Sequence, residues 1–217
     1  MKDLPVSRVY FKKAASSYDR VRNRDKTTIC DNRAIQTFLE GVKSESRILD
    51  VPCGTGRSIP LIGKNKLLYT GVDISADMLN ICRIKASELP RSNLIKADAR
   101  ALPFLEQEFD HLICFKFLKW LPSDEIVFQV LKEFRRVVKG TLLLNIKVKP
   151  QNVKMNRKEI LDRVRKFLDR YRLGTTARCI DQKNFEEMCV SAGFQIVNIE
   201  ENKASNGFVF NYTLECN

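Results

Sequence analysis

The chain has 217 residues, of which 44% are hydrophobic, and it carries a formal net charge of +12. This length fits one α/β domain, and this hydrophobic fraction excludes an intrinsically disordered chain. No apolar run reaches the roughly 18 to 20 residues that a membrane span needs, and residues 1–13 lack the apolar stretch of a secretory signal.

From residue 47 onward, short apolar strands alternate with helical patterns. Helices are expected to begin at Ser58, just after Ser75 and at Ser123. Strands that alternate with helices form parallel sheets through right-handed crossovers. The pattern therefore predicts a Rossmann-like, doubly wound α/β fold. Its first five strands are predicted at 47–51, 67–72, 93–97, 109–115 and 141–148.

The regular alternation of strands and helices ends after residue 148. An amphipathic helix is predicted at 155–173, and a second helix runs from Gln182 to Ala192 and ends at Gly193. Two strand-like runs follow at 194–200 and 208–215. Because a short polar loop joins them, they are expected to pair in antiparallel fashion at the edge of the sheet.

A glycine turn follows the first predicted strand. That strand ends on Asp50, and the chain then turns through Gly54 and Gly56, where backbone N–H groups can meet a ligand without interfering side chains. Asp73 and Asp98 close the next two strands. A carboxylate after the second strand can accept from both ribose hydroxyls, and Asp98 could accept from the exocyclic amine of adenine.

Each of these aspartates could instead be a helix N-cap or a turn former. Their recurrence at three successive strand ends favours a nucleoside-bearing cofactor. The third glycine of a G-x-G-x-x-G motif would fall at Ile59, and no Gly-Lys-Ser/Thr sequence follows the turn. A cofactor without a pyrophosphate therefore fits better than a dinucleotide.

With these motifs, the chain resembles the class I S-adenosylmethionine-dependent methyltransferases of the small-molecule, ubiquinone-biosynthesis-like type. The resemblance implies a seven-stranded sheet with a reversed final strand, in one domain spanning 1–217. It also implies a helical lid at 1–46 and a basic helical insertion at 149–178 over the active site. The matching segments are Asp50 to Gly56, Gly71 to Ser75, Ala97 to Phe104, Phe109 to Leu121 and Tyr10 to Asp19.

By this resemblance, S-adenosyl-L-methionine is the expected cofactor. The expected contacts are Asp50, Cys53, Gly54, Gly56, Asp73, Ile74, Met78, Asp98, Ala99 and Phe115, together with Tyr18 and Arg22 on the N-terminal lid.

The sequence departs from the family in three places. Pro52 stands where the first glycine of the motif is expected, and the Val138-Lys139-Gly140 segment is shorter than the usual Pro-Gly-Gly turn. Many relatives carry a histidine where this chain has Lys119 or Trp120.

No general base is evident from the sequence. The single histidine, His111, lies inside a strand pattern and is expected to pack rather than to catalyse. Lys116 and Lys119 follow the fourth strand and could orient an anionic group, although both could be ordinary surface lysines. An acceptor that is a carboxylate, a thiolate or a free amine would need no base.

The positive charge is concentrated in two segments. Residues 1–46 hold 10 Lys/Arg against 6 Asp/Glu, and residues 147–178 hold 11 against 3. This pattern is typical of a solvated helix face, or of attraction to an anionic substrate, a nucleic acid or a membrane surface. The leading interpretation is a small, anionic or amphiphilic acceptor. RNA or protein methylation and a non-catalytic cofactor-binding subunit are the alternatives, and the oligomeric state stays open.

The number and spacing of the cysteines indicate the cellular compartment in which the protein is expected. There are seven, at positions 30, 53, 82, 114, 179, 189 and 216, and no two form a C-x-x-C pair. An odd count scattered through apolar runs favours reduced thiols in a cytoplasmic protein. With only one histidine and no clustered ligand spacing, no metal site is expected.

Overall fold

The computed structural model describes residues 26–148, 177–204 and 207–217. Seven strands form one sheet in the order β3-β2-β1-β4-β5-β7-β6. The strands are β1 (Arg47–Asp50), β2 (Leu68–Asp73), β3 (Ser92–Lys96), β4 (Phe109–Cys114), β5 (Val138–Val148), β6 (Phe194–Ala204) and β7 (Gly207–Cys216).

The sheet is parallel except at one strand. Strands β3, β2, β1, β4 and β5 pair in parallel, whereas β7 pairs antiparallel with both β5 and β6. The predicted doubly wound sheet with a reversed last strand is therefore confirmed.

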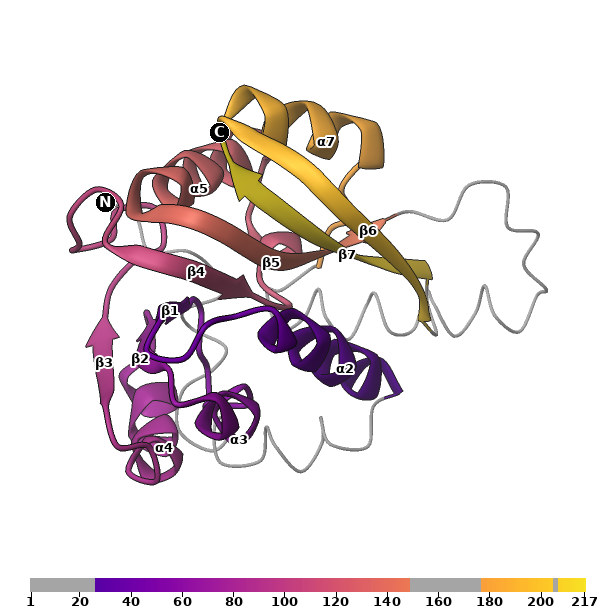
Figure 1. Cartoon of the computed structure of the whole chain (residues 1–217). Coiled ribbons are helices and arrows are strands. Elements are labelled where there is room, and N and C mark those ends of the chain that lie inside the picture. Colours follow the sequence, from indigo (N-terminus) through magenta and orange to yellow (C-terminus); the bar gives the residue numbers. More distant parts are fainter. Residues whose placement is uncertain (1–25, 149–176, 205–206) are drawn as a thin grey trace.

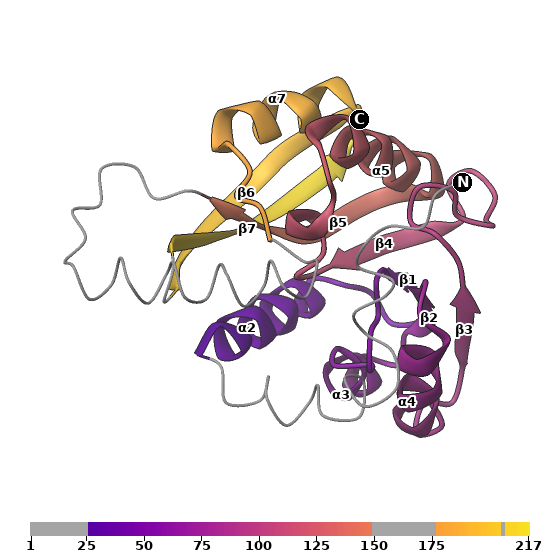
Figure 2. The same cartoon turned by 180° about the vertical axis from the view of Figure 1, so that it is seen from behind.

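Helices cover both faces of the sheet (Figure 1). One face carries α2 (Lys26–Glu40), α3 (Ile59–Ile62) and α4 (Ala76–Ala86), and the other carries α5 (Asp124–Val137) and α7 (Gln182–Ser191). The view from behind shows the same division, with α2 running beside the ends of β4 and β5 (Figure 2). Two separate buried clusters fill these layers, one on each face.

Local capping explains where the helices begin. The hydroxyl of Ser75 accepts from the backbone N–H of Met78, and that of Ser123 accepts from Ile126. The carboxylate of Asp181 does the same for Asn184 at the start of α7. These side chains satisfy N–H groups that have no partner inside the helix.

One boundary differs from the sequence-based expectation. The Val138-Lys139-Gly140 segment was expected to be a turn, but it forms the first residues of β5 and directly follows α5. An added Cβ at Gly140 would lie 2.4 Å from the carbonyl oxygen of Asp110, so the glycine permits close approach of β4 and β5. The short helix expected from Ser58 to about Gly63 is α3 (Ile59–Ile62).

Some predicted segments lie outside the described residues. They are the amphipathic helix at 155–173, most of the basic insertion at 149–178 and the N-terminal part of the lid, including Tyr18 and Arg22. Within the described residues, no helix is both long enough and apolar enough to cross a membrane.

Candidate functional site

The glycine turn occupies the carboxyl ends of the parallel strands. It leaves β1 through a cis peptide bond between Val51 and Pro52, and it is tied to β2 because the N–H of Cys53 donates to the carbonyl of Val72 at 2.8 Å. In open α/β sheets, ligands bind at this edge, where the strand order reverses. Here that reversal lies between β1 and β4.

The two glycines of the turn have different surroundings. Both have positive φ, +54° at Gly54 and +75° at Gly56. Among the described residues, a Cβ added at Gly54 would meet no atom within 4 Å, whereas one at Gly56 would lie 2.6 Å from Ile59 and 2.9 Å from Cys82. Gly54 therefore borders open space, and Gly56 is required for packing between the turn and α3 and α4.

Asp73 holds the turn from the neighbouring strand. Its carboxylate accepts from the backbone N–H of Gly54 at 2.9 Å and from that of Ser75 at 2.8 Å. Burial raises the pKa of Asp73, and these backbone donors oppose the rise. A carboxylate offers about four acceptor positions, so further hydroxyl donors can be accommodated.

Asp50 is turned into the protein interior. It is 5% exposed, and one carboxylate oxygen accepts from the hydroxyls of both Ser58 and Tyr69. Burial raises the pKa of Asp50 to about 6. Ser58 therefore supports the strand end rather than capping α3, which has no side-chain cap. The described contacts make Asp50 a support of the turn, and its predicted contact with the cofactor stays a prediction.

Asp98 has a partner that sequence reasoning missed. The guanidinium of Arg100 bonds both of its carboxylate oxygens, with Nε at 3.0 Å from each. Burial acts to raise the pKa of Asp98, but the hydrogen bonds and charge of Arg100 hold it below its usual value. A role for Asp98 at an adenine amine stays a prediction, with Arg100 competing for the same oxygens.

The other predicted contacts lie in the turn itself or after the ends of β2, β3 and β4. Met78, in the first turn of α4, and Phe115, directly after β4, are buried, as is Ala99 after β3. Ile74, next to Asp73, is half-buried. A hydrogen bond with Cys82 and burial raise the pKa of Cys53, so its thiol is held neutral.

A buried acid on α2, Asp31, joins three elements at this edge of the sheet. One of its oxygens lies 3.0 Å from both Nη1 of Arg57, in the glycine turn, and Nζ of Lys116, after β4. Its other oxygen accepts from the amide of Asn145 on β5 at 3.1 Å. Asp31 is 1% exposed. We call these four residues the Asp31 cluster.

The Asp31 cluster carries two cations for one carboxylate. The guanidinium of Arg57 also lies over the ring of Phe115, 5.7 Å from its centre. The backbone N–H of Lys116 donates to Asn145 at 2.8 Å, which fixes Lys116 at a positive φ of 57°. Sequence reasoning missed Asp31 as a member of the site. Its position four residues before buried Ile35 was an available signal, since it places a carboxylate on the apolar stripe of a helix.

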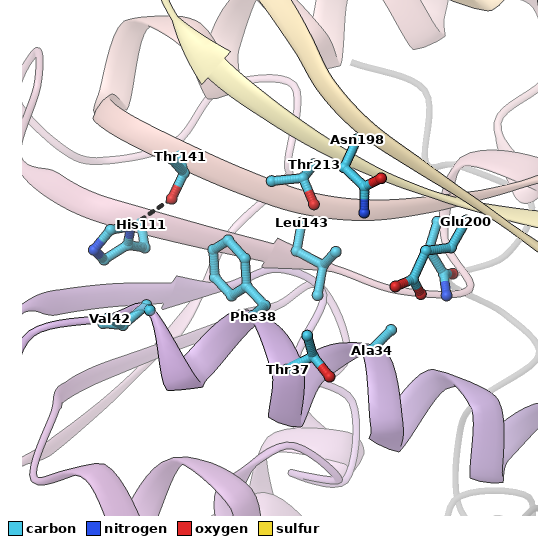
Figure 3. Close-up of a pocket in the computed structure, with 12 residues that line it drawn as sticks. Ala34, Thr37, Phe38, Val42, His111, Thr141, Leu143, Asn198, Glu200 and Thr213 are labelled. Atoms are coloured by element: carbon cyan, nitrogen blue, oxygen red, sulfur yellow. Dashed lines mark hydrogen bonds between the residues drawn. The ribbon is translucent and has the colours of Figure 1, made fainter.

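The two candidate lysines are separated by the structure. The ammonium of Lys116 contacts Asp31 and the hydroxyl of Thr28, whereas that of Lys119 lies 5.5 Å from the ring centre of Trp120. His111 lies in β4 with Nδ1 2.7 Å from the hydroxyl of Thr141. It lies on the face of the sheet that α2 covers, with its ring centre 5.9 Å from that of Phe38, in keeping with the packing role expected for it (Figure 3).

Metal ligation has no candidate in the described part of the chain. Across residues 26–148, 177–204 and 207–217, no group of three or more His, Cys, Asp or Glu side chains is arranged to hold an ion.

Comparisons with known proteins find similarity to methyltransferases. A family model described as a methyltransferase domain matches residues 48–141. An uncharacterized protein of Methanocaldococcus jannaschii is 26% identical over 205 residues, which cover 87% of this chain and 76% of that protein. The demethylmenaquinone methyltransferase of Staphylococcus aureus strain JH9 is 30% identical over 139 residues, which cover 59% of this chain and 54% of the relative. This chain therefore spans about half the length of the staphylococcal protein.

The fold is shared with a solved methyltransferase. The structure of magnesium protoporphyrin IX methyltransferase from Synechocystis, with bound S-adenosylhomocysteine, matches with a TM-score of 0.74. The match covers 99% of this chain and all of that one, at 15% sequence identity. At that identity the likeness concerns the fold.

Proposed function

Because the chain belongs to the class I S-adenosylmethionine-dependent methyltransferases, we propose that it transfers a methyl group to a small acceptor that is anionic or amphiphilic. The observation that carries the site assignment is the pairing of Asp73 with the backbone of Gly54 beside open space. That arrangement presents a fixed carboxylate and an uncovered main chain to one ligand.

The residues at the turn fit S-adenosylmethionine. Asp73 keeps acceptor positions for the two ribose hydroxyls, and Gly54 has no side chain to obstruct the ligand. Met78, in the first turn of α4, and Phe115, directly after β4, are buried apolar side chains that we expect to contact the cofactor. These assignments, with Asp50, Asp98 and the lid residues Tyr18 and Arg22, remain proposals.

S-adenosylmethionine supplies a methyl group that is already activated on a sulfonium. The remaining task of the protein is to hold an acceptor in line and to exclude water. Among the described residues the clearest cations at the site, Arg57 and Lys116, are engaged with Asp31. We therefore assign Lys116 no role as a base, and an acceptor that is already nucleophilic suits this site.

The proposal that the acceptor is anionic is based on the distribution of positive charge in this chain. Arg57 and Lys116 lie beside the glycine turn, and residues 1–46 and 147–178 carry an excess of basic residues. Such a field attracts anions over distances of about 10 Å at ordinary ionic strength. The staphylococcal methyltransferase that matches this chain is named for a small-molecule acceptor, demethylmenaquinone.

Transfer of a labelled methyl group tests this proposal. The protein is incubated with methyl-labelled S-adenosylmethionine and, in parallel, with a small-molecule extract separated by anion exchange, with total RNA and with total protein. We expect label in an anionic or solvent-extractable small-molecule fraction, and none when Asp73→Ala replaces the wild type. Label in RNA or protein would favour those acceptors instead. Cofactor binding without transfer to any fraction would favour a non-catalytic subunit.

A further inference from the structure

The loop after β3 lies beside the residue proposed to hold the ribose. The backbone N–H of Ala97 donates to the carbonyl of Asp73 at 3.2 Å, which continues the pairing of β3 with β2 past the last residue of β3. Asp98 follows directly, and the N–H of Ala101 donates back to its carbonyl at 3.0 Å. Asp98 is therefore close to a nucleoside whose ribose is bound by Asp73.

Both carboxylate oxygens of Asp98 are already bonded by one residue, Arg100. Oδ1 accepts from the backbone N–H of Arg100 at 2.9 Å and from its Nε at 3.0 Å. Oδ2 accepts from the same Nε at 3.0 Å and from Nη2 at 2.5 Å. The side chains of Asp98 and Arg100 are only 14% and 13% exposed. The carboxylate is thus held by a guanidinium fork and by the main chain at the same time.

The loop that carries this pair is fixed at its far end as well. The N–H of Leu102 donates to a carboxylate oxygen of Glu133 on α5 at 2.6 Å, and Nη2 of Arg136 donates to the carbonyl of Leu102 at 3.0 Å. Leu102 is buried in the core cluster that α5 covers. With one end held to β2 and the other to α5, the turn has little freedom to separate Asp98 from Arg100.

This pairing changes what Asp98 can contribute to the recognition of a base. A protein group selects for a ligand N–H because that group is left buried and unpaired when the ligand lacks the N–H. Asp98 does not meet this condition, because Arg100 stays bonded to it whichever ligand is bound. A bidentate guanidinium–carboxylate pair is also stronger than a single bond from a neutral amine, so an amine does not displace Arg100.

We propose that Arg100 is a specificity-determining residue of the cofactor site, and that by holding Asp98 it makes binding insensitive to the 6-amino group of the purine. The site then accepts S-nucleosyl ligands built on adenine, or on a purine without that amine, almost equally. Asp98 borders the base as the partner of Arg100 rather than as the acceptor of the amine. This inference rests on the proposed cofactor, but not on the identity of the methyl acceptor.

Calorimetric titration of the full chain with two ligands tests the proposal. One is S-adenosylhomocysteine, and the other is its purine-riboside analogue, in which hydrogen replaces the 6-amino group and every ring nitrogen is kept. The wild type should bind the two with affinities within about 3-fold of each other, since the analogue leaves no protein group unpaired. Arg100→Ala should prefer S-adenosylhomocysteine by at least about 10-fold, because the freed Asp98 pairs with the amine and is left unpaired by the analogue.

Two further variants separate this effect from folding. Arg100→Met keeps the apolar stem of the side chain and removes its donors, so it replaces Arg100→Ala if that variant does not fold, with the same preference expected. Arg91→Ala is the matched control, because Arg91 pairs with Glu45 at the surface, where the two side chains are 70% and 62% exposed. The control should bind both ligands as the wild type does. Thermal unfolding shows that each variant is folded at the temperature of titration.

Two outcomes would overturn the proposal while leaving the cofactor assignment intact. One is a wild type that prefers S-adenosylhomocysteine by more than about 3-fold, which would show that the amine is recognised while Arg100 is present. The other is a folded Arg100 variant with the same preference as the wild type. If the wild type binds neither ligand, the proposed function itself is contradicted, and this inference with it.

Discussion

The ammonium of Lys116 lies 3.0 Å from a carboxylate oxygen of Asp31, although 85 positions separate the two residues in the chain. The same oxygen accepts from Arg57 of the glycine turn. Helix α2 is thereby fixed to two loops at the carboxyl edge of the sheet. A change in the conformation of either loop is therefore expected to alter the position of α2.

Replacing Asp31 with alanine should destabilise the protein strongly. The change leaves Arg57 and Lys116 without their buried counter-charge, and breaking a buried pair in this way costs about 3–5 kcal/mol. Urea denaturation gives the free energy of unfolding. Glu45→Ala is the matched control, because Glu45 pairs with Arg91 at the surface, where the two side chains are 62% and 70% exposed. The control should change the free energy of unfolding by less than about 1 kcal/mol. Similar losses in both variants would contradict a structural role for the Asp31 cluster.

Alanine at the two glycines of the turn should separate binding from folding. Both positions have positive φ, which costs an alanine about 1–2 kcal/mol. Gly54→Ala adds only that strain to folding but places a methyl group where the cofactor is proposed to lie. Gly56→Ala also collides with Ile59 and Cys82, which adds about 1–3 kcal/mol. Thermal unfolding should therefore show the larger loss for Gly56→Ala.

Calorimetry with S-adenosylhomocysteine completes that comparison. Gly54→Ala, still folded, should bind the ligand at least about 10-fold more weakly than the wild type. Unchanged affinity in Gly54→Ala would show that the open space beside this glycine is not used by the ligand.

The buried carboxyl of Asp50 should make stability depend on pH. Its pKa is raised from 3.8 to about 6, so between about pH 4 and pH 6 the native state retains a proton that the unfolded chain releases. The free energy of unfolding therefore falls as the pH rises through this window, by at most about 3 kcal/mol from this group. Asp50→Asn does not titrate and should lack this component.

Urea denaturation of the wild type and of Asp50→Asn at pH 4, 5, 6 and 7 measures the difference directly. The variant should gain stability relative to the wild type as the pH rises. A difference that stays constant over this range would show that Asp50 is not held at a raised pKa.

Much of the fold follows from local sequence patterns. The strands that end at Asp50, Asp73 and Cys114 are short apolar runs, and their ends are marked by polar residues or glycine within a few positions. The antiparallel pairing of β6 and β7 follows from the short loop between two strand-like runs. Each of these signals involves residues close together in the chain, which is why they could be read before the structure was known.

The contacts that complete the site could not be predicted in this way. Asp31 meets Lys116 and Asn145 only because α2 packs against the ends of β4 and β5, and no local pattern encodes that packing. The beginning of β5 at Val138 was wrongly expected to be a turn, because the Pro-Gly-Gly turn of the similar methyltransferases was carried over to the Val138-Lys139-Gly140 segment.

We propose that Asp73 binds the ribose of S-adenosylmethionine beside the uncovered main chain of Gly54. Calorimetric titration of S-adenosylhomocysteine into the wild type and into Asp73→Ala tests it most directly. Because two hydrogen bonds to a charged group would be lost, at about 1.5–3 kcal/mol each, affinity should fall by about 10²- to 10⁴-fold. Thermal unfolding of the same samples shows that the variant is folded at the temperature of titration. A folded Asp73→Ala variant that binds S-adenosylhomocysteine as tightly as the wild type would contradict the assignment.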